Sequence, residues 1–126
     1  MKKALCCALV AAMLLCTNGC SGGGTALSDK ALSVAKQAVE VADAYIDMEI
    51  DSDEAEEKLD ALEEEMEYSF DLAIDDEHKA DYTISVDLTL LSSAISNDSY
   101  DNTSESYDKV VEARNSLAED AGLKKR

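Results

Sequence analysis

Apolar residues recur at helical spacing along most of the chain beyond residue 26. Between residues 28 and 48 they form two adjacent stripes with steps of three and four, and charged residues occupy the remaining face. An apolar face of this width predicts a helix that packs against two neighbours, with Ser28 as its N-cap. The two stripes are Leu32, Ala35, Val39, Ala42 and Ile46, and Ala31, Val34, Ala38, Val41, Tyr45 and Met48.

A second helix is predicted to begin at the next polar boundary. Asp51 followed by Glu54 has the form of a capping box, and Ile50 is placed to pack on Ala55 as a hydrophobic staple. One face of this helix is apolar and the other is almost entirely acidic, and two consecutive acids at 75–76 mark the turn that follows. The inward positions are Ala55, Leu59, Leu62, Met66, Phe70 and Ala73.

The third element has two readings. The segment Tyr82–Leu90 alternates strictly and is rich in β-branched residues, which is typical of a strand. No other segment alternates well, so a lone strand would leave its backbone groups unpaired. We therefore favour a helix, with the strand as the alternative. The helical stripes would be Ile84, Leu88, Leu91 and Ile95, and Tyr82, Val86, Leu90 and Ala94.

The remaining residues predict a polar loop and a last helix. The loop is SNDSYDN, residues 96–102, and the helix covers residues 102–120 with Gly122 as its stop signal. The chain has no proline, and between the segment 22–24 and Gly122 it has no glycine, which disfavours two-sided β architectures. We predict an all-α fold, a small antiparallel bundle of three to four helices over residues 27–126. The inward positions of the last helix are Tyr107, Val110, Val111, Ala113 and Leu117.

The first nineteen residues have the layout of a secretory signal peptide. Lys2 and Lys3 precede an uncharged run over residues 4–15, which is too short to span a bilayer, and small residues follow. The step from Gly19 to Cys20 resembles the lipobox of bacterial lipoproteins. Thr17 stands where that family prefers an aliphatic residue.

The resemblance implies cleavage before Cys20 and attachment of diacylglycerol and fatty acyl (palmitate-type) chains to its thiol. Residues 1–19 would then be the signal peptide, and residues 20–26, with the run SGGG, the lipidated cysteine and a flexible tether. Cys16 is the alternative attachment site, but Leu15 is a poor small-residue substitute before it. The expected location is the extracytoplasmic face of the cell membrane, and no other cofactor is predicted.

Processing would change the composition that matters for function. All 28 acidic residues and nine of the eleven basic residues follow Cys20, so the predicted mature chain has a formal charge of −19. This charge argues against nucleic-acid binding, because phosphate contacts need clustered Lys and Arg. It also repels an anionic membrane surface, which leaves the lipid anchor as the predicted membrane contact. No free thiol would remain for disulfide, metal or nucleophilic chemistry.

The segment DMEIDSDEAEEK, residues 47–58, invites comparison with a calcium-binding loop. The comparison fails because Ser52 stands where glycine is required and Lys58 where a bidentate acid should be. We expect a solvated acidic face that binds divalent cations weakly at most. The weak metal candidates are Asp47, Glu49, Asp51 and Asp53.

The sequence contains no catalytic constellation, and we predict that the protein is not an enzyme. His78 is the single histidine and is expected to be an exposed residue at a helix start, and no nucleophile-elbow motif is present. Tyr100 and Tyr107 flank the predicted polar loop and are the candidate interaction residues. The function predicted is a non-enzymatic interaction or adaptor module at the cell envelope, with an envelope protein as partner. The alternative is capture of a cation or small solute near the membrane for a transporter, which requires a pocket.

Overall fold

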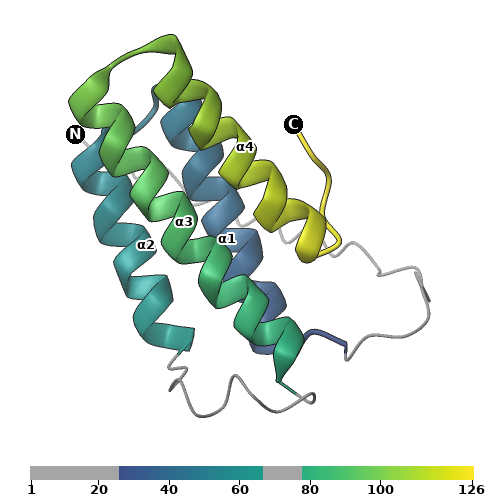
Figure 1. Ribbon diagram of the computed structural model, residues 1–126. Helices are drawn as coiled ribbons and strands as arrows, with labels where there is room; N and C mark the ends of the chain where they lie inside the picture. Colours follow the sequence, from purple (N-terminus) through teal and green to yellow (C-terminus); the bar gives the residue numbers. More distant parts are fainter. Residues whose placement is uncertain (1–25, 67–77) are drawn as a thin grey trace, which may run out of the picture.

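The computed structural model describes residues 26–66 and 78–126, which form four helices in an antiparallel bundle. Figure 1 shows the helices side by side, with the α1–α2 turn and the α3–α4 turn at the same end. The predicted all-α antiparallel bundle is confirmed. The helices are α1 (Asp29–Ile46), α2 (Ser52–Met66), α3 (Lys79–Asp101) and α4 (Ser104–Asp120).

One apolar core runs through the bundle. Among the described residues α1 and α3 each contact the three other helices, whereas α2 and α4 do not touch one another. The apolar face of α1 is wide because this helix packs against three neighbours, one more than the sequence predicts. The largest fully buried side chains are Leu59, Ile84, Leu88, Leu91, Ile95, Leu117, Val34 and Val110.

The ambiguous segment Tyr82–Leu90 is helical and lies within α3. The first predicted stripe, from Ile84 to Ile95, is fully buried. The second stripe is largely on the surface, with Val86 39% and Leu90 56% exposed. The helical period therefore identifies the buried face correctly, and the alternation that suggested a strand has no structural counterpart.

The polar loop predicted at residues 96–102 is wrong, because α3 continues through Asp101. Asn102 does not begin the last helix but ends α3, in a left-handed conformation with φ 46°. Tertiary contacts stabilise this extra turn, since the Asp98 carboxylate accepts hydrogen bonds from Tyr45 on α1 and Ser106 on α4. Propensity alone cannot anticipate contacts of this kind.

Predicted capping residues start two of the helices. The Ser28 hydroxyl accepts from the Ala31 amide at 3.1 Å, and an Asp51 carboxylate oxygen accepts from the Glu54 amide at 2.9 Å. The Glu54 side chain, however, pairs with Lys58 at 2.6 Å. Ile50 is half-buried against the core, as the staple prediction requires.

Left-handed residues end α1 and α4. Gly122, the predicted stop, has φ +68°, and the amide of the next residue bonds back to the Ala118 carbonyl at 2.6 Å. Met48 plays the same part after α1 with φ 60°, and its side chain is 88% exposed. The prediction that Met48 faces inward is wrong, because α1 ends at Ile46 and the chain reverses its twist before Met48.

A buried ion pair joins α1 to α4. The Arg114 guanidinium is bidentate on Asp43, with Nε to Oδ1 at 2.9 Å and Nη2 to Oδ2 at 2.8 Å. A further nitrogen of Arg114 donates to the Lys124 carbonyl at 2.8 Å. Arg126 pairs with Asp43 and Asp47, so the segment after α4 is held against α1. Figure 1 shows this C-terminal segment folding back beside α4.

Several predictions fall outside the described residues. These are the signal peptide 1–19, the lipidated Cys20 with most of the tether, and the positions Phe70, Ala73 and 75–76. Within the described part of the chain, no helix combines the length and the apolarity needed to cross a membrane.

Candidate functional site

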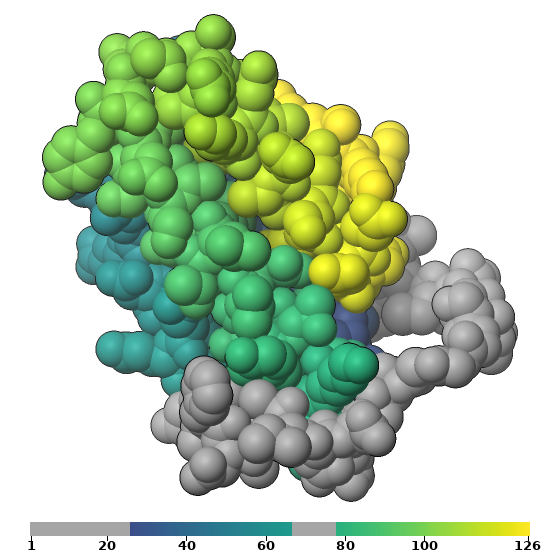
Figure 2. All heavy atoms as spheres, viewed as in Figure 1, coloured from purple at the N-terminus to yellow at the C-terminus, as the bar shows by residue number. Residues whose placement is uncertain are grey.

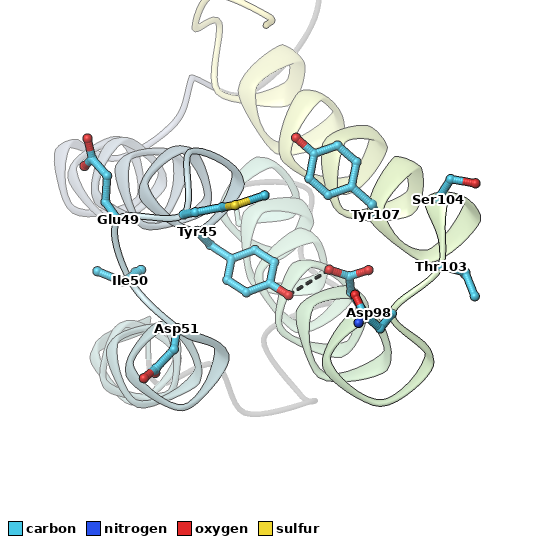
Figure 3. Close-up of a pocket in the computed structure, with 10 residues that line it drawn as sticks. Tyr45, Glu49, Ile50, Asp51, Asp98, Thr103, Ser104 and Tyr107 are labelled. Carbon is cyan, nitrogen blue, oxygen red and sulfur yellow. Dashed lines mark hydrogen bonds between the residues drawn. The ribbon is translucent and has the colours of Figure 1, made fainter.

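An open depression lies at the end of the bundle where the α1–α2 and α3–α4 turns meet, and we call it the tip pocket. Its volume is about 610 Å³, within the range of small-ligand sites. Figure 3 shows it from the side of the turns, with Tyr45 reaching from α1 to α3 and Tyr107 beside it on α4. The lining residues are Tyr45, Met48, Glu49, Ile50, Asp51, Asp98, Asn102, Thr103, Ser104 and Tyr107.

Local backbone chemistry explains why the turns are tight enough to form this site. After α1 the left-handed Met48 allows the Glu49 amide to bond to the Ala44 carbonyl at 2.8 Å. At the other turn a capping box joins Thr103 and Ser106, with reciprocal side-chain to backbone bonds at 3.1 Å. Both turns are fixed by their own hydrogen bonds, so the pocket walls are preorganised.

A chain of hydrogen bonds crosses the base of the tip pocket. The Tyr45 hydroxyl donates to Asp98 Oδ2 at 2.7 Å, and the Ser106 hydroxyl donates to Asp98 Oδ1 at 2.6 Å (Figure 3). Burial, followed by the hydrogen bond to Asp98, raises the pKa of Tyr45 to about 12. Tyr45 therefore remains a neutral phenol at physiological pH, and the Asp98 carboxylate is fixed in orientation on both sides.

The two predicted interaction residues behave differently. Tyr107 lines the tip pocket and is 37% exposed, so its predicted inward position is only partly correct. Tyr100 is 86% exposed and belongs to α3, but it does not line the pocket. The sequence pattern did not identify Tyr45 or Asp98 as site residues. Tyr45 was placed in the core stripe and Asp98 in a loop, and neither position signals the bond between them.

The weak metal candidates do not converge on one point. Asp47 pairs with Arg126, and hydrogen bonding to that guanidinium lowers the pKa of Asp47. Asp51 caps α2, and Glu49 and Asp53 are exposed. Within residues 26–66 and 78–126, no three His, Cys, Asp or Glu side chains lie close enough to hold a metal ion.

His78 is half-buried at the N-cap of α3 rather than exposed, which corrects its predicted position. Its carbonyl accepts the Tyr82 amide at 2.9 Å, as an N-cap carbonyl does at the start of a helix. Its imidazole is not among the residues that line the tip pocket.

Comparison with known proteins gives no relative: no family model, curated protein or solved structure matches the chain. The functional argument therefore rests on the chemistry of the described residues.

Proposed function

We propose that the protein is a lipid-anchored, extracytoplasmic and non-enzymatic interaction module whose tip pocket binds a basic segment of an envelope protein. One observation carries the proposal. Two turns that are more than fifty residues apart in sequence place tyrosine faces and carboxylates around one open pocket.

The lining chemistry favours a cationic side chain. Arg and Lys bind over aromatic faces and pair with carboxylates, and Tyr45 and Tyr107 offer such faces. Glu49 and Asp51 add exposed negative charge at one turn. The Asp98 carboxylate already accepts two hydrogen bonds, so it contributes mainly to the electrostatic potential of the pocket. The overall acidity of the chain steers basic partners toward it and repels acidic ones.

The position of the pocket suits a tethered protein. The predicted tether leads into α1 near Ser28, and the tip pocket lies at the opposite end of that helix. Eighteen residues at the α-helical rise span about 27 Å. A lipid anchor at Cys20 would thus present the pocket on the side of the bundle away from the membrane.

Solute capture is the second candidate, and the same pocket supports it for one class of solute. An organic cation of side-chain size would use the tyrosine faces and carboxylates as a basic peptide would. For a transporter-linked carrier, a free organic cation should bind as tightly as the same group within a peptide.

Fluorescence anisotropy tests the proposal with the purified Cys20→Ala protein. A labelled Arg/Lys-containing peptide should bind, and Glu49→Gln together with Tyr107→Ala should weaken it at least tenfold. Glu64→Gln removes the same charge from an exposed position on α2 and should change the affinity less than twofold. Equal weakening by Glu49→Gln and Glu64→Gln would show that only diffuse charge attracts the peptide, and would refute the proposal.

The cellular arm tests both the partner and the anchor. A photo-cross-linking residue at position 107 should capture a discrete envelope protein, whereas the same residue at the exposed position 93 on α3 should not. Membrane fractionation of a Cys20→Ala variant should move the protein out of the membrane fraction. Identical products from positions 107 and 93 would contradict a partner at the tip pocket.

A further inference from the structure

A second depression lies in the groove between α3 and α4, on the flank of the bundle rather than at its tip. It encloses about 310 Å³ and takes its apolar lining from Leu90, Ala94 and Ala113. Figure 2 shows the face of the molecule on which α3, in green, meets α4, in yellow. Leu90 is 56% exposed, so apolar surface is available there without any rearrangement of the core. We call this depression the flank groove.

Asp87 belongs to the lining of the flank groove and is the observation that points to a ligand. Its side chain is 6% exposed, and its buried Oδ2 atom has no hydrogen-bond partner. A buried carboxylate oxygen without a donor is costly, because folding removes water that is not replaced. Native proteins usually satisfy such atoms, and an exception at the wall of a cavity indicates a missing donor.

The surrounding side chains do not supply this donor. Lys109 also lines the groove, but its ammonium lies 3.4 Å from Glu105, one turn earlier on α4. Asp120 on α4 interacts with Asp87 and adds a second carboxyl group. Burial, and then the hydrogen bond and charge of Asp120, raise the pKa of Asp87 to about 7. A positively charged donor is therefore what this wall of the groove lacks.

We infer that the flank groove binds an alkylammonium group, with the ammonium donating to Asp87 Oδ2 and the methylene chain packing on Leu90, Ala94 and Ala113. This site is separate from the tip pocket, and it does not depend on the proposed function. The ammonium satisfies the buried oxygen and neutralises the carboxyl pair, while the apolar lining removes methylenes from water.

Other ligand classes fit less well. An anion would face Asp87, Asp120 and Glu112 together. A metal ion would need three converging ligands, and no such group exists among the described residues. A purely apolar ligand would leave Asp87 Oδ2 without a donor. An alkylammonium group satisfies both the polar and the apolar parts of the groove.

The experiment is an NMR titration of the purified full chain with n-pentylamine at pH 8, followed through backbone amide shifts. We expect saturable shifts concentrated at Leu90, Ala94 and Ala113. Asp87→Asn should weaken binding at least tenfold, whereas Asp108→Asn, which removes the same charge from an exposed site on α4, should change it less than twofold. Shortening the amine should weaken binding by about fourfold for each buried methylene.

Further arms keep the inference falsifiable. Leu90→Ser alters an exposed side chain, so the fold should persist, and it should flatten the dependence on chain length. A blocked tripeptide containing lysine replaces the free amine in a parallel titration, and tighter binding of one form identifies the natural source of the ammonium. Equal weakening by Asp87→Asn and Asp108→Asn would overturn the inference, as would shifts confined to the tip pocket around Tyr107.

Discussion

Replacement of Asp87 by asparagine should change how the stability of the bundle depends on pH. Asp87 is 6% exposed on α3, and its Oδ2 atom has no hydrogen-bond partner. Burial is the main cause, and the carboxyl group of Asp120 the second, of a pKa raised from 3.8 to about 7. The folded protein therefore holds a proton on Asp87 at mildly acid pH that the unfolded chain releases.

The sign and size of the effect follow from this difference. Asp87 gives its full stabilising contribution below pH 3.8, and the contribution is lost progressively as the pH rises toward about 7. Each pH unit in this interval reduces the free energy of unfolding by at most about 1.4 kcal/mol. Across the interval the loss is on the order of 4 kcal/mol, a large fraction of the stability of a small domain. An asparagine does not titrate, so this component should vanish in the variant.

Urea denaturation at pH 5, 6, 7 and 8 measures the effect for the wild type, Asp87→Asn and Asp108→Asn. The wild type should lose stability between pH 5 and 7, and Asp87→Asn should give a flatter profile and exceed the wild type at pH 8. Asp108 is exposed on α4, so Asp108→Asn controls for the general relief of acidic repulsion. Parallel profiles for the two variants would refute the reasoning, because the pH dependence would then belong to the total charge.

Three further substitutions test the packing and the turns. Met48→Gly should raise the free energy of unfolding by about 1 kcal/mol, and Gly122→Ala should lower it by a similar amount, because both positions are left-handed and nothing lies within 4 Å of a Cβ at Gly122. Thermal unfolding of this pair would contradict the assignment if both changes had the same sign. Arg114→Met should cost about 2 kcal/mol, since it strands the Asp43 carboxylate, whose side chain is 31% exposed, and the loss should persist at 1 M salt. Ser28→Ala should cost about 1 kcal/mol in urea denaturation through the lost N-cap, and an unchanged midpoint would argue against the cap.

The buried faces of the helices could be predicted from the sequence because helical periodicity reports directly on them. Residues such as Val34, Leu59, Leu88 and Leu117 recur at steps of three and four, and all are buried. The sequence alone also determined the helical class, the caps at Ser28 and Asp51 and the stop at Gly122. These features depend on residues within a few positions of one another, and their physics is local.

The tertiary structure decided the features that depend on distant residues. The hydrogen bond from Tyr45 to Asp98 and the ion pair from Arg114 to Asp43 join positions 53 and 71 residues apart. No periodic pattern encodes such pairs. Their formation extended α3 through a segment that is polar enough to read as a loop, and it assembled the tip pocket from two turns. The same holds for Asp87, because a carboxylate on a helix face has a normal environment until packing removes the water around it.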